Sequence, residues 1–211
     1  MNQRIFESHE DLSQAAARAI LQSGAKSIAV TGGSTPKRLY EILAPSLPED
    51  VTWVLVDERF VPHDDPQSNA AMIERTLFSR GIPSQWLRFD TSLPDAAASA
   101  RDFASRFDLP ALDLVLLGCG DDGHTASLFP GTPVLDVVDR VAAEVYVPRL
   151  EQWRVTLTLP VIRAAKQRMV LVSGESKRAV LDEVRQGVDH PVVRATQGVD
   201  TWWYLYGVRQ P

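Results

Sequence analysis

A histidine and an aspartate stand close together in a glycine-rich stretch with the composition of a catalytic loop. The stretch runs from Gly118 to Gly123, with Asp122 near its end and His124 directly after it. Histidine exchanges a proton near neutral pH, and a neighbouring carboxylate can orient its ring. A lone histidine is more often structural, but the surrounding glycines and the preceding apolar run favour a site. We therefore predict that His124 is a general base and that Asp122 assists it.

The same stretch matches the letters G-x-G-x-x-G, which in other chains can bind a dinucleotide. In this chain, the carboxylates of Asp121 and Asp122 would face the negatively charged pyrophosphate and repel it. Pro130 and Pro133 leave little room for the long helix that such a motif opens. The glycines are better explained as bends that let Asp122 and His124 project into a crevice.

A second turn, Thr31–Pro36, has the features of an anion site. Gly32 and Gly33 allow a close backbone approach, and Ser34 precedes a predicted helix whose free N–H groups attract negative charge. The turn suits a phosphate monoester and lacks the lysine and the length of a nucleoside-triphosphate loop. From the turn alone, an anion site and a plain capped turn are equally good interpretations.

Four charged residues near predicted element boundaries could complete such a site. Asp57 and Arg59 follow a predicted buried strand, where Asp57 would lie near the reacting carbons and Arg59 would face an anion or a developing oxyanion. Arg154 and Lys177 are further cations, and each of the four could equally be a solvated surface side chain. Converging on Gly32–Ser34, they would form a positive pocket in a chain whose formal net charge is −5.

Other reactive residue types lack the partners that a site requires. Ser34 and Ser176 do not lie in G-x-S-x-G, and Cys119, which is the only cysteine, is interpreted as a packed thiol. His63-Asp64-Asp65 has no further ligands at metal-binding spacing. We predict neither a metal nor a cofactor.

Short apolar segments alternate with helical periodicity along the chain. Two segments, 114–117 and 169–172, are apolar without alternation, as in strands covered on both faces. We predict an α/β fold in one domain, residues 1–211, with an open, mostly parallel sheet between two helical layers. Because parallel strands end at one edge, the turns after them should meet in one crevice. The predicted strands are Ser27–Thr31, Val51–Asp57, Trp86–Phe89, Leu112–Gly118, Val145–Pro148, Met169–Ser173 and Trp203–Val208.

Four helices are indicated by apolar residues that recur three or four positions apart. Glycines follow three of them, and Ser or Thr precedes two as an expected cap. The predicted helices are Leu12–Ile20 before Gly24, Leu39–Leu43 behind a Thr35 cap and Pro36, Ala70–Leu77 between a Ser68 cap and Gly81, and Val180–Val184 before Gly187.

Composition limits the classes of partner. The chain has 211 residues, 45% hydrophobic and 23% charged, which is globular. With 27 acidic against 22 basic residues, a broad basic face for nucleic acid or an anionic membrane is disfavoured. The start is unlike a signal peptide, and no apolar run approaches the roughly 18–20 residues that span a bilayer. We expect a cytoplasmic protein, a monomer or a weak homo-oligomer.

Taken together, the motifs resemble those of the 6-phosphogluconolactonase family, within the wider group that includes glucosamine-6-phosphate deaminase. The most specific matching segment is Gly118–Gly131, and the resemblance extends from Phe6 to Val184. The tail from His190 to Pro211 matches less clearly, and we predict no site residues in it. The other matching segments are Thr31–Pro36, Asp57–Arg59 with Ser68-Asn69, Arg154–Pro160 and Ser173–Lys177.

The resemblance implies hydrolysis of 6-phospho-D-glucono-1,5-lactone, a small sugar phosphate, to 6-phosphogluconate in the oxidative pentose phosphate pathway. It implies His124 as the general base and a sugar pocket lined by Asp57, Arg59 and Asp122. The phosphate and the rest of the substrate would be held by Gly32, Gly33, Ser34, Asn69, Arg154 and Lys177.

Two other functions remain as alternatives, a sugar-phosphate isomerase or deaminase and a non-catalytic sugar-phosphate-binding protein. Deaminase relatives carry a glutamate where this chain has Phe129, and that carboxyl assists ring opening of an amino sugar. Water can add to a lactone carbonyl without prior ring opening, so Phe129 counts against deamination. A sensor would normally need an output segment, and none is visible.

Overall fold

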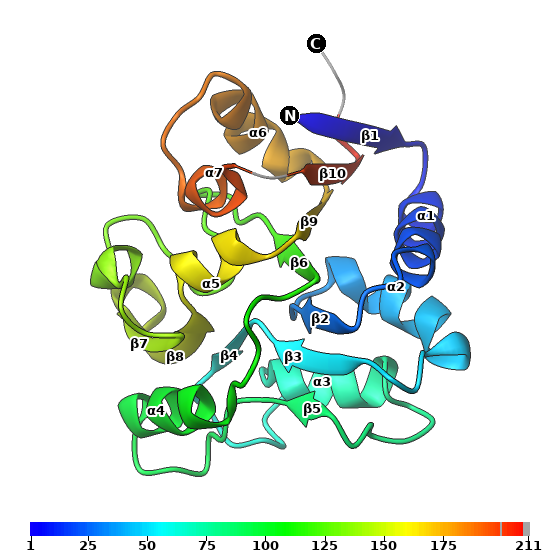
Figure 1. Cartoon of the computed structure of the whole chain (residues 1–211). Coiled ribbons are helices and arrows are strands. Elements are labelled where there is room, and N and C mark those ends of the chain that lie inside the picture. Colours follow the sequence, from blue (N-terminus) through cyan, green and yellow to red (C-terminus); the bar gives the residue numbers. More distant parts are fainter. Residues whose placement is uncertain (199, 209–211) are drawn as a thin grey trace.

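Seven parallel strands form the central sheet of the computed structural model, which describes residues 1–198 and 200–208 (Figure 1). The strand order is β1-β10-β9-β6-β2-β3-β5, and all the pairings in this sheet are parallel. The alternation of strands and helices thus correctly predicted a parallel sheet. The bounds are β1 Asn2–Phe6, β2 Ser27–Val30, β3 Thr52–Leu55, β5 Trp86–Leu87, β6 Leu114–Gly118, β9 Gln167–Ser173 and β10 Thr201–Tyr206.

Helices cover both faces of this sheet, which explains why its central strands are apolar without alternation. In Figure 1, α1 and α2 lie on one side of the sheet, and α5 and α7 lie on the other. All four residues of β2 are buried, and so are the first four residues of β6. The helices are α1 His9–Gln22, α2 Thr35–Leu43, α3 Asn69–Thr76, α4 Ala96–Arg106, α5 Leu159–Ala164, α6 Arg178–Arg185 and α7 Pro191–Thr196.

A second, antiparallel sheet was not expected. It contains β4 Asp57–Arg59, β8 Gln152–Leu157 and β7 Ala142–Val147, in the order β4-β8-β7. The prediction of one strand over Val51–Asp57 was therefore wrong at its end, because the chain leaves the main sheet at Val56 and pairs with β8. The predicted strand Val145–Pro148 likewise belongs to this smaller sheet.

Some elements escaped prediction for identifiable reasons. β1 is an edge strand with four exposed residues, so it has no apolar run to reveal it. β8, α4, α5 and α7 were not predicted either. Ser68 caps α3 as expected, since its Oγ accepts from the amide of Ala71. Thr35 does not cap α2: Ser34 occupies the cap position without a side-chain bond, and Thr35 Oγ1 pairs with Ser173 Oγ instead, at 2.9 Å.

The order of the strands reverses between β2 and β6. From β2 the chain proceeds through β3 to β5 at one edge, whereas from β6 it proceeds through β9 to β10. The loops that leave β2 and β6 therefore diverge, and such a switch point opens a crevice beyond the carboxyl ends of the strands. This crevice lies between the two glycine-rich turns.

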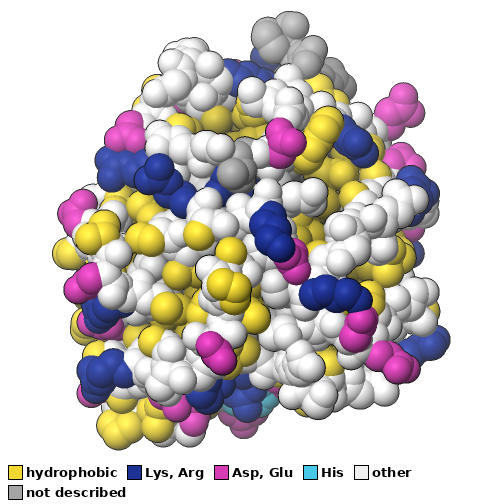
Figure 2. All heavy atoms as spheres, in the orientation of Figure 1, with side chains coloured by type: hydrophobic (Ala, Val, Ile, Leu, Met, Phe, Trp, Pro, Cys, Tyr) yellow, Lys and Arg dark blue, Asp and Glu magenta, His cyan; other side chains and the backbone are white. Residues whose placement is uncertain are grey.

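The surface seen in Figure 2 carries acidic and basic side chains interspersed, with apolar patches between them. In residues 1–198 and 200–208, no helix is long and apolar enough to cross a lipid bilayer.

Candidate active site

A cavity of about 420 Å³ opens at the switch point. The glycine turn after β2, the loop after β6, the strands β4 and β8, and the segment after β9 all contribute to its wall. Every residue predicted for the site lines this cavity except Asp122, which lies behind His124. The predicted residues that line it are Gly32, Gly33, Ser34, Asp57, Arg59, Asn69, His124, Arg154 and Lys177.

The imidazole of His124 is fixed by Asp122. Nδ1 of His124 lies 2.5 Å from Oδ1 of Asp122, which also accepts from the His124 amide at 3.2 Å. Partial burial raises the pKa of Asp122, but the hydrogen bonds from His124 and the charge of Arg149 outweigh it and hold that pKa well below its usual range. Because the carboxylate is ionised, Nδ1 carries the ring proton, and the neutral ring keeps its lone pair on Nε2.

A glycine is required where this loop bends. A Cβ on Gly120 would lie 2.0 Å from Nδ1 of His124, far inside van der Waals contact. The amide of Gly120 donates to the carbonyl of His124 at 2.8 Å, which closes the turn. Gly120 therefore makes room for His124 and Asp122, whereas a Cβ on Gly123 would meet His190 and one on Gly118 would meet nothing within 4 Å.

Phe129 packs against the ring of His124. Their centroids are 4.2 Å apart with 25° between the planes, and Phe129 is buried. The guanidinium groups of Arg149 and Arg154 lie 5.2 and 5.6 Å from the centroid of the Phe129 ring. A buried apolar ring thus lies directly beside the imidazole of His124.

Asp57, Glu58 and Arg59 alternate in direction, as residues of a strand must. Asp57 and Arg59 line the cavity, and Asp57 accepts from Ser127 Oγ at 2.7 Å. Glu58 turns away, is 1% exposed, and accepts from the first amides of α3, at Asn69 and Ala70. Burial raises the pKa of Glu58 against the effect of these amides. No role had been predicted for Glu58, although it holds α3, which carries Asn69, against the site.

Two arginines beside the cavity each have one buried N–H donor without an acceptor. Arg59 and Arg154 are direct cross-strand partners in β4 and β8. The Nε atom of each is buried and has no hydrogen-bond partner among the described residues. Burial also lowers the pKa of Arg154, with Asp57 opposing this effect. Two neighbouring guanidinium groups with unpaired N–H donors are suited to an anionic ligand.

The turn after β2 presents the N-terminus of α2 to the cavity. Gly33 adopts a φ of +103°, a left-handed conformation that favours glycine. A Cβ on Gly32 would lie 1.8 Å from Oδ1 of Asn69, so this glycine makes room for a protein side chain as well as for a ligand. Ser34 makes no side-chain capping bond, Pro36 has no N–H, and the amide of Lys37 donates to the carbonyl of Ser34 at 3.4 Å.

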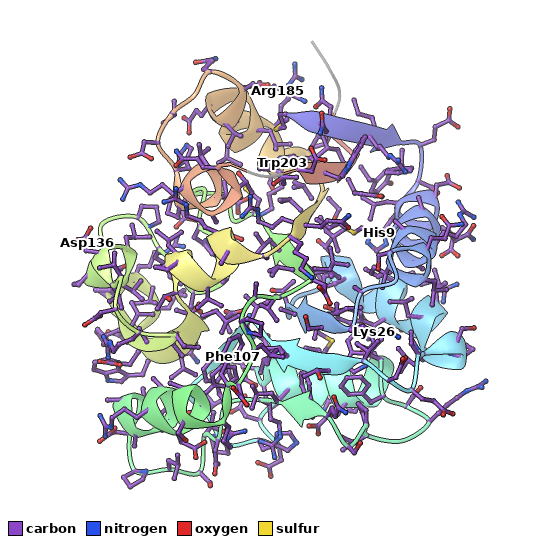
Figure 3. The ribbon with its side chains drawn as sticks, in the orientation of Figure 1. His9, Lys26, Phe107, Asp136, Arg185 and Trp203 are labelled. Carbon is purple, nitrogen blue, oxygen red and sulfur yellow. The ribbon has the colours of Figure 1, made fainter. Side chains whose placement is uncertain are left out.

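Contacts from other elements hold this turn in place. His9, labelled on α1 in Figure 3, donates from Nε2 to the carbonyl of Thr35 at 3.0 Å.

Lys177 also lines the cavity. Its Nζ lies 2.7 Å from Oδ1 of Asp121, and this bond lowers the pKa of the Asp121 carboxyl.

The single cysteine also lines the cavity, but its thiol is unreactive. Burial raises the pKa of Cys119 to about 12, so it stays protonated near neutral pH. In the described part of the chain, no group of three or more histidine, cysteine or acidic side chains is arranged to hold a metal ion.

Sequence reasoning missed several residues around the site. Ser127 lies within the recognised Gly118–Gly131 segment, so its position offered a signal. Arg149 lies outside every recognised segment, and only the structure brings it to Asp122, with 2.5 Å between Nη2 and Oδ2. His9 is likewise distant in sequence from the turn that it supports.

Comparison with known proteins agrees with the resemblance read from the motifs. The family model described as Glucosamine-6-phosphate isomerases/6-phosphogluconolactonase matches residues 3–203. A 6-phosphogluconolactonase from Synechocystis sp. is 40% identical over 184 residues, which cover 79% of this chain and 74% of that protein. The structure of 6-phosphogluconolactonase from Trypanosoma cruzi superposes with a TM-score of 0.87 at 29% identity, covering 97% of this chain and 94% of that chain.

A monomeric glucosamine-6-phosphate deaminase has a similar architecture. It superposes with a TM-score of 0.84 at 22% identity, over 98% of this chain and 97% of its own. This likeness concerns the fold alone. The same scaffold therefore occurs in proteins named for two different reactions, and the distinction depends on the side chains in the site.

Proposed function

The chain belongs to the glucosamine-6-phosphate isomerase/6-phosphogluconolactonase family, and from this premise we propose that it hydrolyses 6-phospho-D-glucono-1,5-lactone to 6-phosphogluconate. This reaction is the second step of the oxidative pentose phosphate pathway. The observation that carries the proposal is the position of His124, whose Nδ1 is held by Asp122 while its ring lines the same cavity as three cationic side chains. A base and an anion-binding region in one cavity suit a substrate that carries an electrophilic carbonyl and a phosphate.

The proposed mechanism is a proton relay through His124. Nε2 takes a proton from water as the water oxygen forms a bond to C1 of the lactone, and the carbonyl becomes an oxyanion. Asp122 stabilises the imidazolium through Nδ1–H. As the tetrahedral intermediate collapses, the bond from C1 to the ring oxygen breaks and the imidazolium returns its proton to that oxygen. The reaction consumes one water molecule and needs no other co-reactant.

The contacts of Arg59 and Arg154 suggest which part of the substrate each of them binds. The sequence-based hypothesis gave Arg59 the oxyanion and Arg154 the phosphate. Arg154 lies against Phe129, which stacks on His124, whereas Arg59 donates from Nη1 to the carbonyl of Gln67 at 2.6 Å, next to α3. We therefore assign Arg154 to the oxyanion and Arg59 to the phosphate end. One well-placed donor to an oxyanion typically contributes about 3–4 kcal/mol to transition-state stabilisation.

The phosphate end is proposed to combine backbone and side-chain donors. The backbone N–H groups of Ser34 and Thr35, at the start of α2, lie at the positive end of the helix dipole. Lys177 and Arg59 add positive charge. Holding the phosphate far from C1 fixes the ring so that its carbonyl meets the base.

The test is a lactonase assay on freshly generated 6-phosphogluconolactone, corrected for its spontaneous hydrolysis. We expect enzymatic turnover, and no ammonia from glucosamine 6-phosphate because Phe129 replaces the ring-opening acid. Ammonia release would favour a deaminase instead. Thermal stabilisation by 6-phosphogluconate without any turnover would favour a binding protein and contradict the proposal.

A further inference from the structure

We propose that Arg149, a residue outside the cavity, lowers the basicity of His124 by sharing the carboxylate of Asp122. The inference rests on the proposed function, because it concerns the base of that reaction. Arg149 is then a positioning residue: it acts on His124 through Asp122 and does not touch the substrate.

The turn that carries Arg149 has a well-defined geometry. β7 and β8 are joined by Pro148–Leu150 and by Glu151, which adopts a left-handed conformation with φ of 48°. Proline fixes the first φ of this turn, and the left-handed residue reverses the chain into β8. The turn thereby brings the guanidinium of Arg149 to Asp122, with its Cζ 5.2 Å from the centroid of the Phe129 ring.

The two oxygens of Asp122 serve two different cations. Oδ1 accepts both bonds from His124, and Oδ2 forms an ion pair with Nη2 of Arg149 at 2.5 Å. The charge of Arg149 reduces the negative potential that Asp122 offers to a protonated imidazole, and it also repels that imidazolium directly. Both effects have the same sign. They keep His124 neutral, and therefore able to accept a proton, to a lower pH than Asp122 alone would allow.

Other charged groups near His124 differ from Arg149 in one respect. His190, which packs against Gly123, pairs with Glu183 at 2.8 Å and not with Asp122. The remaining groups line the cavity or pair with a residue that does, so a change to them would alter ligand binding as well. Arg149 is absent from the cavity wall. Its side chain is 55% exposed, so its ion pair contributes little to the free energy of unfolding. The groups concerned are Arg154 on β8, Asp57 and Arg59 on β4, and the pair Lys177–Asp121 after β9 and β6.

The experiment compares Arg149→Gln, Arg149→Lys and Arg140→Gln with the unmodified chain. Arg140 is a matched control, because it also pairs with an acidic residue of this region, Glu144 at 3.2 Å, without contacting Asp122. Two quantities are measured: the pH dependence of kcat/KM for the lactone, and the titration of the His124 ring by NMR. The NMR titration needs no substrate, so it decides the inference even if the proposed reaction is wrong.

For Arg149→Gln we expect the His124 titration and the acid limb of kcat/KM to move upward together, by roughly 0.5 pH unit, with KM on the plateau unchanged. At the pH where kcat/KM of the unmodified enzyme is half of its plateau value, this shift makes kcat/KM of Arg149→Gln about twofold lower than that of the unmodified enzyme. Arg149→Lys should restore most of the original profile, and Arg140→Gln should not differ from the unmodified chain.

A His124 titration in Arg149→Gln that coincides with that of Arg140→Gln, or that moves downward, would overturn the inference. A shifted titration in a chain without lactonase turnover would instead retain the inference for His124 and refute the proposed reaction.

Discussion

The amino and carboxyl ends of the central strands differ in how the buried guanidinium nitrogens of the nearby arginines are paired. At the amino edge, Arg168 is 1% exposed and donates to the carbonyl groups at the C-terminal ends of α5 and α7. At the carboxyl edge, Arg59 and Arg154 each leave a buried Nε without a partner in the described chain. The described chain pairs the buried donors of Arg168, whereas Arg59 and Arg154 each keep one buried N–H donor that our proposal assigns to a ligand.

This difference separates residues that stabilise the fold from residues that serve the site. A buried donor without a partner costs about 1–3 kcal/mol of stability. Such a cost is expected where a group must bind something that is absent from the folded chain. Substitutions at the carboxyl edge should therefore change activity with little loss of stability, and substitutions at the amino edge should do the reverse.

The largest effect is expected from His124→Ala. Removing the general base should lower kcat by about 10²–10⁴-fold while KM changes little, because the anion-binding groups remain. Steady-state kinetics on fresh lactone, after subtraction of the spontaneous rate, measures this. His63→Ala, which removes a surface histidine paired with Glu74, is the control and should keep full turnover. Wild-type kcat in His124→Ala would refute the assignment of the base.

The next effect is expected at the amino edge. Arg168→Met should lower the free energy of unfolding by about 2–4 kcal/mol, because several buried carbonyl groups lose their donor. Its kcat/KM below the unfolding temperature should stay within about twofold of the original. Urea unfolding and kinetics on the same preparation test both statements. Arg163→Met, at an exposed position, should alter stability by less than about 0.5 kcal/mol.

Lys177→Ala should raise KM by about 10-fold to 100-fold and leave kcat nearly unchanged, because a charged donor to the phosphate is worth about 1.5–3 kcal/mol. Lys166→Ala is the matched control from the amino edge, where Lys166 pairs with Asp113 at 2.7 Å. A fall in kcat as large as the rise in KM would show that Lys177 acts on the reacting carbon and would remove it from the phosphate end.

The smallest effect concerns Asp113 at the amino edge. Its hydrogen bond from Lys166 lowers the pKa of Asp113 to about 2, and the amides of Lys26 and Ser27 contribute to this. Since the folded pKa lies below the unfolded value, ionised Asp113 stabilises the fold above about pH 4, and this contribution is lost as the pH falls toward 2. Asp113→Asn should therefore cost about 1 kcal/mol at neutral pH.

The pH dependence of unfolding tests this assignment. The difference in stability between Asp113→Asn and the unmodified chain should shrink as the pH falls through this window. A difference that is constant from pH 7 to pH 2 would show that the charge of Asp113 is not responsible.

The parallel sheet and its crevice were predictable because they depend on local patterns. Apolar runs such as 114–117 indicate buried strands, and alternation with helices fixes their direction. Polar edge strand β1 gave no such signal. The break at Val56 was also hidden, since the residues on both sides favour a strand and only pairing with β8 divides them.

The candidate site was predictable where its residues lie in recognisable segments. His124, Asp122 and the glycines around them are contiguous, so their proximity follows from the sequence. The pairing of Arg59 with Arg154 depends on the register of two distant strands, and the contact of Arg149 with Asp122 depends on a turn between two others. Neither follows from a local pattern.

The central claim is that one ligand spans the cavity, with its C1 end at His124 and its phosphate at the start of α2. A crystal structure with the product 6-phosphogluconate tests it most directly. We predict that the phosphate accepts from the backbone N–H groups of Ser34 and Thr35 and from Arg59 and Lys177, with the C1 carboxylate beside Nε2 of His124. A phosphate bound at His124, or a product bound outside this cavity, would contradict the account.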